Sequence, residues 1–317
     1  MPRLGKPRKD RNRFGFCCRT QLRSYRSVTA PNIPHRTRKM SKASPAAPDD
    51  KAPYFWRDER LPFIEARSIQ DGRKVCYSRH SHEHFSIGAI THGQSTYINE
   101  QNQWRVAAGT VVLMNPGEVH ACNPIDDQPW AYRMFYVETP WLTSLQHELG
   151  FSQDLDFRAF STPLTTDPTL YEGLNSLYEI LVDDDLALLE KQCALVEFFT
   201  LLQHRLNPAP RPAREINQKL ERAAAYIHKH CTEALKLEDI CQAAQLSASY
   251  LTRAFKQHYG MTPHAFLVNR RIQYARNRLR RGGLIADVAL EAGFADQAHF
   301  QRAFKQHLAA TPGQYRG

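Results

Sequence analysis

The chain has 317 residues, which is enough for two domains with separate cores, and its formal net charge is +10 at pH 7. No apolar stretch approaches the ~18 residues that span a bilayer, so the sequence argues against a membrane partner. Seven scattered cysteines with no CxxC pair predict reduced thiols in a cytoplasmic protein rather than a disulfide framework.

The charge is unevenly distributed along the chain. Residues 1–39 contain 12 Lys or Arg and one acid, and residues 214–317 carry a net charge of +8. Residues 40–213 carry a net charge of −9. A basic C-terminal region is typical of a protein that binds a polyanion, whereas an acidic middle region is not.

Residues 1–50 are basic and then rich in Pro, Ala, Ser and Asp, so they predict a disordered tail. Two interpretations of the basic part remain open. It is an arm that binds DNA, or residues 1–39 are translated upstream sequence and Met40 is the true start. The stretch that begins at Met40 favours the second interpretation, because it is similar to an ordinary protein N-terminus.

Residues 51–165 predict a small antiparallel β-barrel or sandwich. The strand-like segments are short, rich in β-branched and aromatic residues, and separated by turn signals. They are residues 74–80, 85–93, 94–100, 103–116 and 130–138.

Residues 166–206 predict two helices, because leucines recur there as apolar stripes that are broken near residues 183–185. A helix pair that follows a barrel usually packs on that barrel. Residues 207–218 contain several prolines and predict a linker.

Residues 219–317 contain a repeat. Residues 250–266 read YLTRAFKQHYGMTPHAF, and residues 299–315 read HFQRAFKQHLAATPGQY. A short helical stretch and a turn precede each copy. Two copies of a helix-turn-helix unit explain this pattern.

The start of each second helix is marked by a capping residue, Ser247 in the first unit and Asp296 in the second. The small residues Ala244 and Ala292 allow the two helices of each unit to cross closely.

The two second helices carry their polar groups on one face, opposite an apolar face. Arg253 and Arg302 occupy equal positions in the two copies and are the strongest candidates for DNA contact, while Lys256 and Lys305 suit phosphate. The further candidates for DNA contact are Ser249, Tyr250, Thr252, Gln297, His299 and Gln301. Two readings stay open for the arginines between the units, a solvated helix face or phosphate contact: Arg276, Arg278, Arg280 and Arg281.

Residues 220–317 resemble the DNA-binding region of AraC/XylS-type bacterial transcription regulators. The resemblance rests on the two units, on the stretch from Arg271 to Ala275, on IADVALEAGFADQAHFQRAFKQH and on the terminal TPGQYR. It implies promoter DNA as a partner, with helices in successive major grooves joined by a long helix at about 264–281. It also implies an activator that contacts RNA polymerase. Gln245 and Ala309 depart from the expected pattern, because glycine suits a left-handed turn at both positions.

The N-terminal part is similar to the sensor domain of the same family. Residues 80–93 and 107–124 resemble the two halves of a cupin. The resemblance implies an α+β multidomain chain. Its parts would be a cupin-like antiparallel β-barrel at 51–165, a helical dimerisation segment at 166–206 that makes a homodimer, and an all-α C-terminal domain with two helix-turn-helix units.

Histidines in the expected barrel are the candidates for a ligand or metal site. Enzymatic cupins hold a metal with an HxH pair, a Glu and a distant His. Here His82 and His84 are expected to share one face of a strand, with His120 as the distant histidine, but Ser86 stands where the Glu is needed. Metal binding, ligand hydrogen bonding and a structural role all stay open. The sequence predicts no metal and no cofactor, and the candidate ligand contacts are His82, His84, Trp104, His120 and Tyr136.

The sequence therefore predicts a ligand-responsive DNA-binding regulator with no catalytic residues. Its effector would be a small molecule bound in the barrel. One alternative is a metal-dependent cupin enzyme fused to a DNA-binding module. A second is a constitutive DNA-binding protein whose barrel only dimerises.

Overall fold

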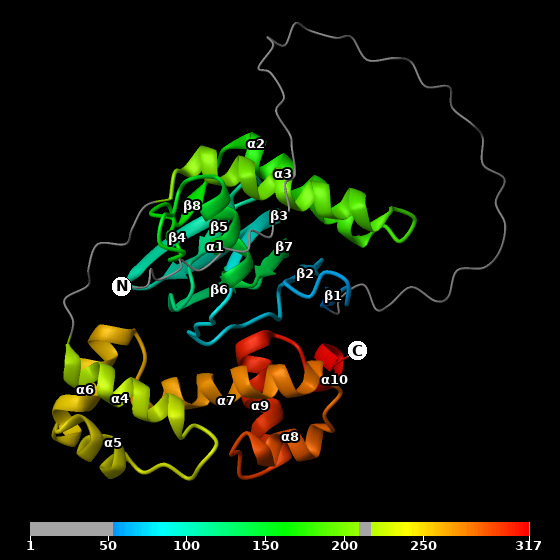
Figure 1. Ribbon diagram of the computed structural model, residues 1–317. Coiled ribbons are helices and arrows are strands. Elements are labelled where there is room, and N and C mark those ends of the chain that lie inside the picture. Colours follow the sequence, from blue (N-terminus) through cyan, green and yellow to red (C-terminus); the bar gives the residue numbers. More distant parts are fainter. Residues whose placement is uncertain (1–52, 209–216, 317) are drawn as a thin grey trace, which may run out of the picture. The chain divides into compact units, whose positions relative to one another are not determined.

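The computed structural model describes residues 53–208 and 217–316, which belong to one compact unit, Ala47–Gly317 (Figure 1). The tail predicted for residues 1–50 lies outside the described residues, as does most of the predicted linker. No helix in the described ranges is both long and apolar enough to cross a membrane.

The N-terminal part is an antiparallel sheet in the order β1-β2-β7-β3-β5-β8, with β4 and β6 paired to the far end of β3. The strands are β1 (Tyr54–Trp56), β2 (Ile64–Ile69), β3 (Phe85–Asn99), β4 (Asn102–Ala107), β5 (Val111–Met114), β6 (His120–Pro124), β7 (Trp130–Val137) and β8 (Leu164–Thr165).

The long strand β3 connects the two halves of the sheet. Its first part pairs with β5 and β7, and its second part pairs with β4 and β6. The register shifts between Ile90 and His92, and Gly93 follows with a φ of +66°. A Cβ at Gly93 would lie 2.1 Å from the carbonyl oxygen of Pro129, so only glycine fits at this turn of the strand.

The antiparallel sheet confirms the predicted class of the N-terminal part, but several segments differ from the prediction. Residues 85–93 and 94–100 form one continuous strand, because Gly93 bends the strand without ending it. Residues 103–116 form two strands, β4 and β5. Residues 74–80 are not a strand, and only His80 makes an isolated bridge there, to His120.

Three helices pack on one face of the sheet, as the predicted helix pair does (Figure 1). They are α1 (Thr139–Glu148), α2 (Pro168–Val182) and α3 (Leu188–Leu206). The break between α2 and α3 confirms the predicted one near residues 183–185, whereas α1 was not predicted. Side chains of β3 alternate between the two faces. Phe85 and Ile87 join the helix side, and Gly88 and Ile90 line a cavity on the other side.

The C-terminal part is entirely helical. Its helices are α4 (Gln218–Lys229), α5 (Leu237–Ala244), α6 (Ala248–Tyr259), α7 (Pro263–Arg280), α8 (Ile285–Glu291), α9 (Gln297–Leu308) and α10 (Pro312–Arg316). The pairs α5–α6 and α8–α9 are the two predicted helix-turn-helix units, and α7 is the predicted joining helix.

The predicted caps and turns are confirmed. The side chain of Ser247 accepts a hydrogen bond from the Tyr250 amide, and that of Asp296 accepts one from the His299 amide. Gln245 has a φ of 54°, in the left-handed region where the sequence pattern would suit glycine. Ala309 is left-handed too, with a φ of 48°.

Candidate functional site

The side chains predicted to contact DNA lie on exposed faces of α6 and α9. Each helix buries two large apolar residues, Leu251 and Phe255 in α6 and Phe300 and Phe304 in α9. This leaves the opposite face of each helix toward solvent. The predicted residues exposed there are Ser249, Tyr250, Thr252, Arg253, Lys256, Gln297, Gln301, Arg302 and Lys305.

His299 differs from the other candidates because it is only partly exposed. Its ring packs edge-on against Phe294, with the centroids 5.2 Å apart. The Thr252 hydroxyl donates to the carbonyl of Ala248 at 2.8 Å, so its oxygen remains able to accept from a partner outside the helix.

The arginines of α7 do not share one role. Arg276 is 5% exposed, so neither of the two readings left open for it by the sequence describes it. Arg278 pairs with Glu291 at 2.7 Å. Arg271 donates to the backbone carbonyls of Cys231 and Glu233, which ties α7 to the segment after α4.

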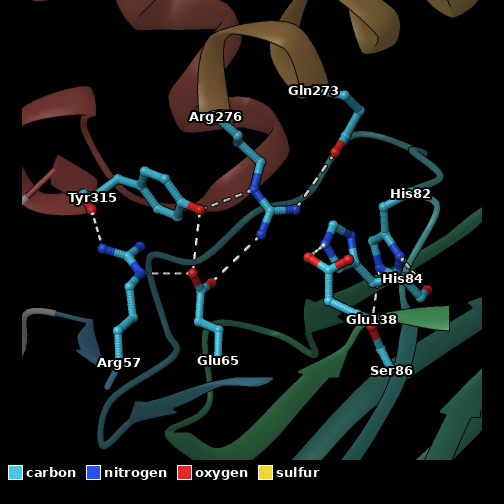
Figure 2. A network of polar contacts seen from close by, with 9 residues as sticks. All are labelled: Arg57, Glu65, His82, His84, Ser86, Glu138, Gln273, Arg276 and Tyr315. Carbon is cyan, nitrogen blue, oxygen red and sulfur yellow. Dashed lines mark hydrogen bonds and ion pairs between the residues drawn. The ribbon is translucent and has the colours of Figure 1, made fainter. Parts of the chain in front are cut away.

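Arg276 belongs to a buried polar network that joins α7 and α10 to the sheet (Figure 2). Its guanidinium lies 3.5 Å from a carboxylate oxygen of Glu65 in β2 and donates to the hydroxyl of Tyr315. The Tyr315 hydroxyl donates to Glu65 in turn, and Arg57 contacts both Glu65 and the Tyr315 carbonyl.

Glu65 stays ionised in this network. Burial alone would raise the pKa of the Glu65 carboxyl, but Arg276 and Arg57 outweigh burial and hold that pKa below its usual range. A buried carboxylate and a buried guanidinium thus compensate each other across 211 residues of sequence.

The histidines form a different group from the predicted one. Residues 81–84 are a loop rather than a strand, so His82 and His84 do not share a strand face. The His84 ring turns toward Glu138, with Nε2 3.6 Å from its carboxylate (Figure 2). The trio that the fold brings together is His80, His82 and His120. Their potential ligand atoms all lie within 4.8 Å of one another.

Each ring of this trio has the same tautomer, because its Nδ1 faces a backbone carbonyl, which can only accept. The neutral ring therefore carries its proton on Nδ1, and Nε2 holds the free lone pair. The distances from Nδ1 to the carbonyl oxygens are 2.8 Å (His80 to Ser78), 2.9 Å (His82 to His84) and 2.8 Å (His120 to Glu118).

All three imidazoles are held neutral. Burial is the main cause of the lowered pKa of each ring. The charge that His120 would carry lowers the pKa of His80 and His82 further. Sequence reasoning missed His80, although the HxH spacing from His80 to His82 was present in the sequence.

A cavity inside the sheet lies beside the trio. Its walls come from β3, β5, β6 and β7 and are mostly apolar, with His80, His120 and Tyr136 as polar members. Trp104 does not line this cavity and instead stacks on Tyr97, with ring centroids 5.7 Å apart. Of the predicted ligand contacts, the structure therefore gathers His82, His120 and Tyr136 and places His84 and Trp104 elsewhere.

A second cavity adjoins the first and is shared with the helical part. Its lining includes Arg67 and Tyr136 from the sheet and Arg276 and His307 from α7 and α9. Arg67 is 1% exposed, and its Nε and Nη2 make no hydrogen bond within the described residues.

Aromatic groups surround the Arg67 guanidinium. It lies 5.0 Å from the centroid of the Phe55 ring and 5.8 Å from that of Tyr77. Burial opposes its charge, but the phenol oxygens of Tyr132, Tyr77 and Tyr136 outweigh burial, so the pKa of Arg67 is raised and the cation persists. Sequence reasoning missed Arg67, because nothing in a strand pattern marks an inward-facing arginine.

Comparisons with known proteins agree with this architecture. Residues 64–199 match the model of an AraC-like ligand-binding domain, and residues 240–317 match that of a helix-turn-helix domain. The HTH-type transcriptional regulator YbfI of Bacillus subtilis is 27% identical over 228 residues, which cover 70% of this chain and 81% of that protein. The MmsAB operon regulatory protein of Pseudomonas aeruginosa is 26% identical over 250 residues, which cover 75% and 77% of the two chains.

A similar fold occurs in a solved structure. Apo ToxT from Vibrio cholerae superposes with a TM-score of 0.50 at 17% identity, covering 80% of this chain and 97% of that one. The matched domains, their order and the two helix-turn-helix units lead to one conclusion. The chain belongs to the AraC family of transcription regulators, with a ligand-binding domain followed by a DNA-binding domain.

Proposed function

We propose that a small organic anion, bound between the sheet and α7, is the effector that controls DNA binding by this regulator. The observation that carries the proposal is Arg67. Its charge is buried, and two of its nitrogen donors have no partner among the described residues. An uncompensated buried charge costs several kcal/mol, roughly, and a carboxylate or similar anion would offset that cost.

The same cavity supplies the rest of a ligand site. The neighbouring apolar cavity, which shares His80 and Tyr136 with it, offers room for a hydrocarbon portion. Mostly apolar walls with a few fixed polar groups are the usual composition of small-molecule sites. The expected effector is therefore an anionic head group with an apolar body.

Coupling to DNA follows from the groups that line the cavity. Arg276 faces the cavity and also pairs with Glu65, so an anion there competes with or reinforces the contact between the sheet and α7. A ligand shifts the protein toward the arrangement that it binds better. The readout is the position of α6 and α9, whose exposed residues we propose as the contacts to base edges and phosphates of promoter DNA.

We further propose that α3 forms the homodimer contact and that the DNA-bound dimer recruits RNA polymerase as an activator. Leu189 is 68% exposed and Val196 is 46% exposed. They stand seven residues apart, with the exposed Cys193 between them, and so share one helix face. The proposed function includes no catalytic residue.

The test replaces Arg67 with Met, which keeps the length of the side chain and removes its charge. Small carboxylates and their uncharged amides are compared by the shift in melting temperature and by the affinity of the full chain for its operator. We expect carboxylates to act on the wild type and not on Arg67→Met. The matched control is Arg105→Met, an exposed arginine of β4, which should respond as the wild type does. Equal responses to carboxylates and amides would overturn the proposal.

A further inference from the structure

We propose that His80, His82 and His120 bind a divalent transition-metal ion, for which Zn²⁺ and Co²⁺ are suitable probes. The first observation is geometric. Three imidazoles from a loop and from β6 come together with their potential ligand atoms within 4.8 Å of one another, and all three side chains are buried. Three histidines are one of the ligand sets that proteins use for zinc, with a fourth position open to water or another ligand.

The second observation is the orientation of the rings. Histidines that bind a metal usually donate their other ring N–H to a carbonyl or carboxylate, which fixes the tautomer and the ring plane. All three rings here donate Nδ1–H to backbone carbonyls. The three Nε2 lone pairs are thus prepared for an ion before it binds, and the low pKa of each ring keeps those lone pairs free of protons.

Two neighbours act against the ion, and neither removes the site. Ser86 lies with its hydroxyl 3.2 Å from Nε2 of His82, and that hydrogen bond would be lost on coordination. Such a bond is worth about 0.5–1.5 kcal/mol, whereas structural zinc sites gain about 10–16 kcal/mol. The charge of Arg276 also opposes a cation, but Glu65 pairs with that guanidinium at 3.5 Å.

The ligand set excludes two nearby residues. Cys122 lines the adjoining cavity, but burial raises the pKa of its thiol to about 12, so a thiolate is not expected there. His84 faces Glu138 and lies outside the trio. The site is therefore expected to contain nitrogen ligands only.

The loop that carries two of the ligands is held by the DNA-binding domain. Asn269 of α7 donates to the carbonyl of Ser81 at 3.0 Å, and Gln273 donates to the same carbonyl at 3.3 Å. Ser81 stands between His80 and His82. An ion that orders this loop would act directly on the residues that α7 contacts.

The experiment uses the untagged full-length protein, stripped of metal with a chelator and titrated with Co²⁺ and then Zn²⁺. We expect one ion per chain, a Co²⁺ visible spectrum without thiolate bands, and X-ray absorption that reports three imidazole nitrogens at about 2.0–2.1 Å from the zinc. Absence of Co²⁺ and Zn²⁺ binding by the wild type, or a thiolate signature, would overturn the assignment.

Variants identify the ligands. His80→Gln and His120→Gln should each weaken binding by about 100-fold or more, above the 10–100-fold that loss of an orienting partner costs. His84→Gln is the matched control and should bind as the wild type does. Equal binding by the wild type and the His80→Gln and His120→Gln variants would sink the proposal. The titration of the wild type decides the matter even if a variant fails to fold.

The result is separable from the proposed effector function. A chain that binds no metal but responds to carboxylates through Arg67 would contradict only the metal site. A chain that binds one ion but has no response to carboxylates would contradict only the proposed anion.

Discussion

The two helix-turn-helix units have similar sequences but different contacts with the ligand-binding domain. The first unit meets it through apolar packing, since Val119 lies in one hydrophobic cluster with Leu251 and Phe255. The second unit meets it through polar contacts, including the hydrogen bond from the Ser78 amide to the Gln306 carbonyl at 2.8 Å. The Arg276 network lies beside this second contact.

The difference indicates a division of roles. Apolar packing tolerates small displacements without a change of charge, whereas a buried ion pair depends strongly on its geometry. The positions predicted to face DNA are the same in both units, as Arg253 and Arg302 illustrate. We therefore expect effector events to reach the second unit first, and the following predictions test that comparison.

The largest effect is expected from Glu65→Ala. It leaves the guanidinium of Arg276 buried without its carboxylate, which costs about 3–5 kcal/mol of unfolding free energy. Chemical denaturation of the full chain measures this. Val119→Ala, at the contact of the first unit, should cost less, because it removes two methyl groups and exposes no charge. A larger loss for Val119→Ala than for Glu65→Ala would contradict the division of roles.

The pH dependence of the same residue has a definite sign. The pKa of Glu65 is lower in the folded protein, so its contribution to stability is present above the unfolded pKa of about 4.3. It is lost as the pH falls through the lower folded pKa. The wild type should thus lose stability more steeply below about pH 4.3 than Glu65→Gln does.

The next effect concerns DNA. Arg253→Ala and Arg302→Ala should each cost about 1–3 kcal/mol on the cognate operator, since both remove a donor suited to base edges. Lys305→Ala should weaken binding to all sequences and lower the salt dependence. Gel-shift titrations at several salt concentrations measure both. Unchanged affinity in the double arginine variant would show that these helices do not read the operator.

The smallest effect compares the ends of α6 and α9. Ala309 is left-handed at a position where the first unit has Gly260, so Ala309→Gly should raise stability by up to about 1 kcal/mol. Gly260→Ala should lower stability by a similar amount. A Cβ there would lie 3.5 Å from Val119, which is an ordinary contact, so the cost comes from the φ of +69° alone. Melting temperatures of the two variants should move in opposite directions.

The sequence predicted the features that local patterns determine. The two units, their caps at Ser247 and Asp296 and the joining helix depend on residues a few positions apart, where capping and helical periodicity apply. The antiparallel sheet was predictable as a class. The continuous β3 was not, because a glycine in a strand pattern suggests a turn as readily as a bend.

The site was harder to predict because its residues meet through tertiary contacts. The choice between His80 and His84 depends on the path of a loop, which strand alternation does not describe. Arg276 looked like a surface residue because its partner Glu65 lies 211 residues away. Arg67 is recognisable as unusual only once its burial is known.

The long separation of Glu65 and Arg276 also bears on synthesis of the protein. At about 5–20 residues per second, the ribosome makes Arg276 roughly 10–40 s after Glu65. The sheet can fold in that interval, while Glu65 remains hydrated at a surface that α7 will later cover. Burial of the carboxylate is then delayed until its guanidinium partner exists. A nascent chain truncated before α7 should accordingly expose this acidic surface, which identifies docking of the DNA-binding domain as a late step of folding.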